Sequence, residues 1–147
     1  MAIIIPQEYS YVLLAATSTL FVNMYHSLLT SSKRKASGIK YPTTYASQEL
    51  ADKDPKAFQF NCAQRAHANF TENLTPAIIG MLVTGLKYPV FAAIGGGAWS
   101  FFRAVYAAGY VANGPSGRTA GAIGGSLTDI VMKLAAAYTA VSFAMGW

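Results

Sequence analysis

The sequence predicts an all-α integral membrane protein built as a four-transmembrane-helix bundle in a single domain, residues 1–147. The first observation is composition, since 53% of the 147 residues are hydrophobic and only 12% are charged. An ordinary globular domain carries about 25% charged residues. The second is that apolar residues gather in four long segments, and the third is that basic residues gather on one side of them. Together these features favour a membrane protein over a soluble domain.

The first predicted span covers residues 9–30 and contains no charged residue. At about 1.5 Å per residue, such a helix is about 33 Å long and crosses a hydrocarbon core of about 30 Å. A polar loop, residues 31–57, follows it with three acids and six basic residues, namely Lys33, Arg34, Lys35, Lys40, Lys53 and Lys56. The start of the chain, "MAIIIPQEYS", has no basic region ahead of its apolar residues, so we expect no cleaved signal peptide.

The other three spans are separated by tight turns. The second covers about residues 58–86 and ends at the turn "LKYP". The third covers about residues 90–112 and ends at "NGPSGR", which has strong proline and glycine signals. The fourth covers about residues 119–147. The tight turn between the second and third spans predicts that these two helices pack as antiparallel neighbours.

The distribution of basic residues predicts the orientation. The long loop and "NGPSGR" lie on one side and carry seven basic residues, whereas Lys87 is alone on the other side. The positive-inside rule places the basic side in the cytosol and both termini in the lumen. The net charge of +5 therefore indicates topology, and we expect no nucleic-acid partner because the basic residues are not interleaved with aromatic residues along a face.

Three glycines four residues apart, Gly117, Gly121 and Gly125, match the small-residue pattern that lets membrane helices approach closely. The alternative is a flexible start to the fourth span. Asp129 and Lys133 stand four residues apart on the same span and are expected to form an internal pair.

Neither metal chemistry nor a disulfide is expected. His26 and His67 have no ligand-like partners at a suitable spacing. Cys62 is the only cysteine, which excludes an intramolecular disulfide, and it is expected to be a small buried apolar residue.

A line of polar residues, "RAHANFTE", opens the second span. Arg65, Asn69 and Glu72 stand at i, i+4 and i+7 and therefore share one helix face. Arg65 precedes Leu86 by 21 residues, which places it about 32 Å away, near the cytosolic boundary. Glu72 lies about 21 Å from Leu86 by the same measure.

The third span repeats the pattern, with Arg103, Tyr106 and Tyr110 on one face. Glu72 and Arg103 share one depth, and Arg65 and Tyr110 share another. Because the second and third spans pack as antiparallel neighbours, both faces are expected to line a cleft that opens to the cytosol. Ionisable residues inside a membrane usually face such a cavity and are functional candidates.

The predicted cleft has more cations than anions. One acid, Glu72, faces five cations, namely Arg34, Lys35, Arg65, Arg103 and Arg118. Excess positive charge favours an anionic ligand, and guanidinium groups bind carboxylates in a bidentate way. The alternative for Glu72 and Arg103 is an internal ion pair that only stabilises the bundle.

Two motifs resemble the signatures of a known family, the membrane-associated proteins in eicosanoid and glutathione metabolism (MAPEG). "FNCAQRAHANFTE" followed by Pro76 resembles the motif of that family's second helix, and "FFRAVYAAGYVANGPSGR" resembles that of its third. "EYSYVLLAAT" and "KYPTTYAS" are similar to the microsomal glutathione S-transferase type 3 branch. The resemblance covers essentially the whole chain.

The resemblance implies a homotrimer in the endoplasmic reticulum or the mitochondrial outer membrane. It also implies that the cosubstrate glutathione binds between neighbouring subunits, in a site facing the cytosol. Arg118 matches the arginine that activates the thiol in the family. The remaining residues that the match assigns to glutathione binding are Arg34 or Lys35, Arg65, His67, Asn69, Glu72, Arg103, Tyr106 and Tyr110.

The expected function is conjugation of glutathione to hydrophobic electrophiles, reduction of lipid hydroperoxides, or both. Asn73 replaces the aromatic residue of leukotriene C synthase, which argues against specific leukotriene synthesis. The chain ends at "FAMGW" without a cysteine-bearing tail, so no C-terminal lipidation is expected. A non-catalytic lipid-binding scaffold of the lipoxygenase-activating type is the alternative. A transporter using Glu72 is disfavoured because the sequence shows no internal repeat.

Overall fold

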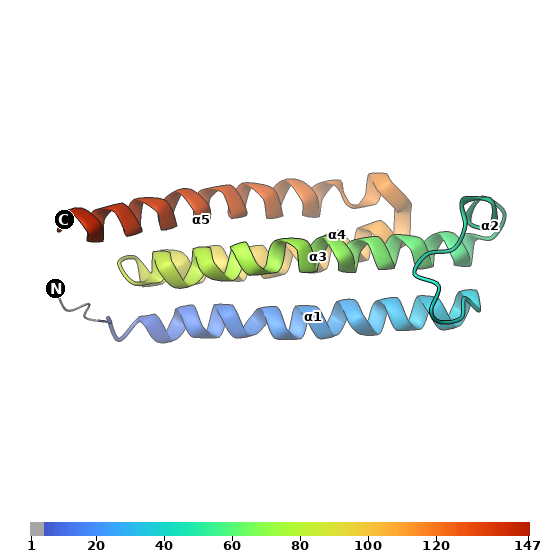
Figure 1. Ribbon diagram of the computed structural model, residues 1–147, viewed down its shortest axis with the longest axis horizontal. Coiled ribbons are helices and arrows are strands. Elements are labelled where there is room, and N and C mark those ends of the chain that lie inside the picture. Colours follow the sequence, from blue (N-terminus) through green and yellow to red (C-terminus); the bar gives the residue numbers. More distant parts are fainter. Residues whose placement is uncertain (1–4) are drawn as a thin grey trace.

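The computed structural model describes residues 5–147 as an elongated helical bundle (Figure 1). Four long helices lie side by side, and one short helix sits in the loop at one end of the bundle, which we name the loop end. Within residues 5–147 there is no β-strand, which confirms the all-α prediction. The helices are α1 (Tyr9–Ser37), α2 (Gln48–Lys53), α3 (Pro55–Gly85), α4 (Pro89–Gly117) and α5 (Thr119–Met145).

Local sequence signals explain where the helices begin and end. α1 ends at Gly38, which adopts a left-handed conformation with φ of 70°, and α5 ends in the same way at Gly146 with φ of 77°. α3 begins after Asp54, whose carboxylate accepts a hydrogen bond from the backbone N–H of Lys56. Pro55 occupies the first turn of α3, where its missing N–H has no partner to lose.

Among the described residues, three helices are long and apolar enough to cross a membrane, namely α1, α4 and α5. α3 has 31 residues and is therefore long enough as well. It is less apolar because the polar line from Arg65 to Glu72 lies within it. The surface of the bundle is rich in apolar side chains: Leu14, Phe21 and Ile94 are each more than 60% exposed. Such a surface is suited to contact with lipid.

The centre of the bundle is filled by side chains from all four long helices. Val12 of α1, Phe70 and Met81 of α3, Trp99 of α4 and Met132 of α5 belong to one buried cluster. Aromatic rings continue it, with the Phe70 and Trp99 centroids 5.7 Å apart. The relative rotation of the helices is therefore set by this core.

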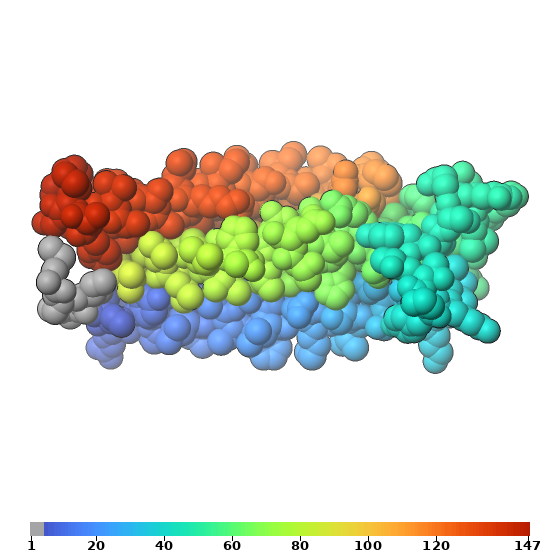
Figure 2. Space-filling model, viewed as in Figure 1, coloured from blue at the N-terminus to red at the C-terminus, as the bar shows by residue number. Residues whose placement is uncertain are grey.

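The loop between α1 and α3 covers the loop end of the bundle (Figures 1 and 2). The side chain of Asn61 holds it at two points, accepting from Ala46 N–H at 2.8 Å and donating to Ala46 C=O at 3.0 Å. Arg34 holds it at another, donating to the Thr43 carbonyl at 2.7 Å while its guanidinium lies 4.5 Å from the Phe60 ring centroid. These contacts fix the loop over the ends of α1 and α3.

α4 is interrupted near its end, and the chain then folds back against it. Gly114 has φ of 65° and ψ of −153°, a conformation that favours glycine, and Pro115 follows. After this break, Gly117 lies against Gly109, so closely that a Cβ on either glycine would overlap the carbonyl oxygen of the other. The fold-back brings the residue after Gly117 alongside α4.

α5 continues this close approach. A Cβ on Gly121 would overlap the backbone of Tyr106, and one on Gly125 would touch the side chain of Arg103 at 3.6 Å. The prediction that Gly117, Gly121 and Gly125 serve helix packing is thus confirmed, and the three glycines place α5 directly on α4.

Candidate functional site

Arg118 lies against two tyrosines of α4. Its Nη1 donates to the hydroxyl oxygen of Tyr106 at 3.2 Å, and its Cζ lies 4.9 Å from the ring centroid of Tyr110. The two rings meet edge to face with centroids 5.7 Å apart. The fold-back at Gly114 makes this possible, because it returns Arg118 to the level of residues that precede it by two and three helical turns.

Arg118 keeps its positive charge. The hydrogen bond with Tyr106, together with that residue's electrostatic effect, raises the pKa of Arg118 above its ordinary value. The positive charge of Arg65 acts in the opposite direction and has a smaller effect. Arg118 is half-buried and thus remains accessible to a ligand.

Arg65 and Glu72 form an exposed ion pair on α3. Nη1 of Arg65 donates to Oε1 of Glu72 at 2.9 Å, and Nη2 lies 3.4 Å from Oε2. The side chains are 46% and 52% exposed. The alternative considered from their equal depth, an internal pair of Glu72 with Arg103, is therefore not found, because Glu72 pairs with Arg65. Arg65 and Glu72 are two helical turns apart on the same face of α3, so Arg65 is the cation that reaches the Glu72 carboxylate.

Arg103 is buried beside Asn69 instead. It is 5% exposed, and its Nη2 donates to the backbone oxygen of Asn69 at 2.8 Å and to Oδ1 at 2.6 Å. Its Cζ lies 5.4 Å from the Trp99 ring centroid and 5.3 Å from that of Tyr106. We use the name arginine–tyrosine face for the predicted residues other than Arg103 that α3, α4 and the turn after α4 bring to this region: Arg65, Asn69, Glu72, Tyr106, Tyr110 and Arg118. Tyr106 is buried, whereas the other five are exposed or half-buried.

Two other predicted residues lie in a different place. His67 follows Arg65 by two residues, which turns it about 200° around the helix. Its Nε2 forms a hydrogen bond with Oδ1 of Asn23 on α1 at 3.2 Å. His67 and Arg34 line a groove of about 250 Å³ between α1 and α3, together with Gln64, which we name the α1–α3 groove. A single copy of the chain does not bring this groove together with the arginine–tyrosine face.

The two basic residues at the end of α1 differ in environment. Arg34 is buried and engaged with the loop, whereas Lys35 is exposed. On α5, Nζ of Lys133 lies 2.5 Å from Oδ2 of Asp129, which confirms the predicted pair. Cys62 is buried, as expected. Within residues 5–147, no three His, Cys, Asp or Glu side chains lie close enough to hold a metal ion.

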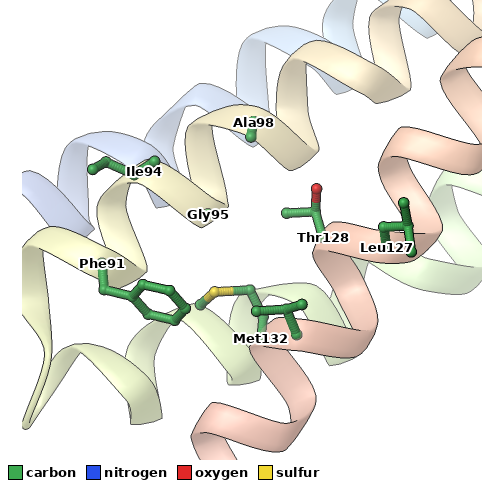
Figure 3. Close-up of a pocket in the computed structure, with 8 residues that line it drawn as sticks. Phe91, Ile94, Gly95, Ala98, Leu127, Thr128 and Met132 are labelled. Carbon is green, nitrogen blue, oxygen red and sulfur yellow. The ribbon is translucent and has the colours of Figure 1, made fainter.

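The structure also contains an apolar groove of about 290 Å³ between α4 and α5, which was not among the features predicted above (Figure 3). Its lining includes Phe91, Ile94, Leu127 and Val131, and the Met132 side chain reaches towards Gly95 across it. Its only hydroxyl, that of Thr128, donates to the Gly124 carbonyl at 2.7 Å, so little polarity remains. The sequence feature that could have indicated this groove is Gly95, which has no side chain and lies among the apolar residues of its lining.

A comparison with protein families identifies the chain. The model described as the MAPEG family matches residues 12–138. The chain belongs to the MAPEG family. This family includes glutathione transferases, peroxidases and non-enzymatic members. With its three apolar helices, this MAPEG protein is an integral membrane protein.

Proposed function

We propose that this MAPEG protein is a membrane-bound glutathione transferase of the microsomal type 3 kind. It would join glutathione to hydrophobic electrophiles, reduce lipid hydroperoxides, or do both. The observation that carries the proposal is the position of Arg118, a charged guanidinium held by Tyr106 and Tyr110.

The charges of the arginine–tyrosine face match those of glutathione. The tripeptide has two carboxylates and one ammonium group, and the face offers two guanidinium groups, Arg65 and Arg118, and one carboxylate, Glu72. Because the Arg65–Glu72 pair is largely exposed, opening it costs about 0–1 kcal/mol. Each partner is then free to bind an oppositely charged group of the ligand, Arg65 a carboxylate and Glu72 the ammonium.

Arg118 is the residue that we assign to thiol activation. A free thiol has a pKa of about 8.5, and the thiolate is the nucleophile. A guanidinium near the sulfur stabilises the thiolate and lowers that pKa. The thiolate then forms a carbon–sulfur bond with an electrophilic carbon. It either displaces a leaving group, which departs with the electron pair of the broken bond, or adds to a polarised double bond, whose electron pair takes a proton from water. With a hydroperoxide it attacks the terminal oxygen, the O–O bond breaks, and an alcohol and a glutathione sulfenic acid result. A second glutathione converts the sulfenic acid to the disulfide and water.

We also propose that the functional unit is a homotrimer with its site between subunits. Arg34 and His67 lie in the α1–α3 groove, away from the arginine–tyrosine face of the same copy. Contact between the groove of one subunit and the face of the next would bring both sets of predicted residues to one ligand. In this arrangement Arg34 is better placed than Lys35, because Lys35 does not line the groove.

The proposed topology has four spans, with α3 as the fourth membrane-crossing helix and both termini in the lumen. The loop end would then face the cytosol, where glutathione is available, in the endoplasmic reticulum or mitochondrial outer membrane. The hydrophobic substrate would enter laterally from the bilayer. The basic residues of the loop end support this orientation.

The second candidate is a non-catalytic lipid-binding scaffold. The apolar groove between α4 and α5 favours it, because a lipid chain can bind there without any reacting group (Figure 3). The two candidates differ in whether the purified protein ionises and consumes glutathione.

The experiment is ultraviolet difference spectroscopy of glutathione bound to the purified protein at neutral pH. We expect thiolate absorbance in the wild type, its loss in Arg118→Ala and its partial return in Arg118→Lys. Lys53→Ala is the matched control, because Lys53 is an exposed cation on α2 that pairs with Glu49. Absence of both thiolate and glutathione-dependent turnover in the wild type would exclude the transferase and leave the scaffold.

A further inference from the structure

Arg103 is placed behind the arginine–tyrosine face rather than on it. Its guanidinium is 5% exposed, whereas Asn69, to which it donates, is half-buried. Asn69 lies one turn from both Arg65 and Glu72 on the same face of α3. Asn69 thus stands between Arg103 and any ligand bound there.

The chemistry of guanidinium determines how the Asn69 amide is oriented. Arginine has five N–H donors and no acceptor, so the Asn69 atom 2.6 Å from Nη2 must be the carbonyl oxygen, Oδ1. The amide nitrogen is consequently turned away from Arg103. Within the described residues, Nδ2 of Asn69 forms no hydrogen bond, which leaves both of its N–H donors available.

Neighbouring amides on α3 use their donors internally. Nδ2 of Asn73 donates to the backbone oxygen of Asn69 at 2.8 Å, and Nδ2 of Asn61 donates to the Ala46 carbonyl at 3.0 Å. Asn69 differs because its acceptor is occupied while its donors are not. Because its carbonyl oxygen faces Arg103, the Asn69 side chain presents its two N–H donors to an acceptor atom of a ligand.

Arg103 is held firmly enough to impose this orientation. It lies near the rings of Trp99 and Tyr106, and α5 covers it at Gly125, where a Cβ would lie 3.7 Å from Nη1. A guanidinium fixed on several sides cannot swing out to contact a ligand directly, but it can hold the group in front of it.

We infer that Arg103 is a positioning residue, which locks Asn69 so that its amide donates to a carboxylate or peptide carbonyl oxygen of glutathione. This inference rests on the proposed function for the identity of the ligand. It removes Arg103 from direct contact with glutathione. It leaves the ammonium group of glutathione to Glu72, because the Asn69 amide presents N–H donors to the ligand and its oxygen faces Arg103.

Asn69→Asp tests the direction of the hydrogen bond. The variant keeps an oxygen towards Arg103 and replaces the two free donors with an acceptor, while hardly changing the shape. Gln59→Glu is the matched control: Oε1 of Gln59 accepts from Lys33 Nζ at 3.0 Å, so the same amide-to-acid change is made beside a cation elsewhere on α3. Both variants are measured for thermal stability without ligand and for the glutathione Kd.

We expect Asn69→Asp to retain or raise the melting temperature and to weaken glutathione binding about 10- to 100-fold, the loss of one charge-assisted hydrogen bond. Gln59→Glu should change neither quantity by a comparable amount. Wild-type affinity in Asn69→Asp would overturn the inference, because it would show that the amide donors are not used.

Arg103→Lys tests the positioning role. It keeps the charge but loses the fixed fork, so we expect a higher KM for glutathione with a nearly unchanged kcat, and no further rise in KM when Asn69→Asp is added. Additive effects of the two substitutions would contradict the inference. If the wild type binds no glutathione, the proposed function fails, and side-chain amide NMR of Asn69 decides the positioning role. An Nδ2 signal and exchange rate unaltered by Arg103→Lys would then refute it.

Discussion

Gly121→Ala is the most direct test of how α5 positions the candidate site. A Cβ at this position would lie 2.5 Å from Cα of Tyr106 and 2.8 Å from the carbonyl oxygen of Phe102. Carbon atoms in contact are ordinarily about 3.5–4.0 Å apart, so α5 must move away from α4 by about 1 Å. Overpacking of this kind costs about 1–3 kcal/mol, which lowers stability without preventing folding.

The displacement reaches Arg118, which lies less than one helical turn before Gly121. Moving its Nη1 by about 1 Å lengthens the 3.2 Å contact with the Tyr106 hydroxyl beyond hydrogen-bonding distance. A misplacement of about 1 Å can reduce catalysis about 100-fold. We therefore expect Gly121→Ala to reduce kcat/KM by about 10- to 100-fold and to abolish most of the thiolate absorbance.

Gly97→Ala provides the control, because no atom lies within 4 Å of the position that its Cβ would occupy. In a helix this substitution is expected to be neutral or to stabilise by up to about 1 kcal/mol. The assays are the melting temperature, glutathione-dependent turnover and thiolate absorbance of both variants in the same detergent. Turnover and absorbance in Gly121→Ala that equal those of Gly97→Ala would refute the reasoning.

Further predictions concern Arg34, Glu72 and Arg118. Arg34→Ala removes the hydrogen bond to the loop and the contacts with two aromatic rings. We therefore expect the free energy of unfolding to fall by about 2–3 kcal/mol and the loop after α1 to be cleaved faster by a protease. Lys35→Ala, which changes an exposed neighbour, should be cleaved at the wild-type rate. Glu72→Gln breaks an exposed ion pair with Arg65, so the free energy of unfolding should change by less than about 1 kcal/mol. The KM for glutathione should rise more than about tenfold. An unchanged KM would show that Glu72 does not bind glutathione. The raised pKa of Arg118 keeps it charged well above neutral pH, so the pH dependence of the rate should reflect ionisation of the glutathione thiol. Because Arg118 lowers the pKa of that thiol, the rate should rise at a lower pH in the wild type than in Arg118→Ala. Coincident pH–rate profiles would exclude thiol activation by Arg118.

Helical periodicity was sufficient to predict which residues share a face. Arg65 and Glu72 were placed on one face of a helix because they are two turns apart, and the structure joins them in an ion pair. Depth along a span was a weaker guide to partners, because it gives one coordinate and leaves the rotation of the neighbouring helix undetermined. Glu72 and Arg103 share a depth, yet the core around Trp99 turns Arg103 towards Asn69.

Closeness in sequence is also a poor guide to which face of a helix a residue occupies. His67 lies between Arg65 and Asn69 in the chain, but a two-residue step turns it towards α1. The proximity of Arg118 to Tyr106 depends on the backbone break at Gly114, a local conformation that no periodicity could reveal. The turn itself was evident from "NGPSGR", whereas the direction in which it returns the chain was not.

The contact between Gly109 and Gly117 has a consequence for how the site can respond to a ligand. Where two backbones are in direct contact, no side-chain rotamer lies between them that could change their separation. The α4–α5 wall that carries Tyr106 and Arg118 therefore has almost no freedom to adjust. The opposite wall is formed by Arg65 and Glu72, long and largely exposed side chains with many rotamers. Tolerance to ligands of different shape should therefore come from the side chains of α3. The α4–α5 wall, whose close contacts depend on glycine, should instead hold Arg118 in a constant position relative to the ligand.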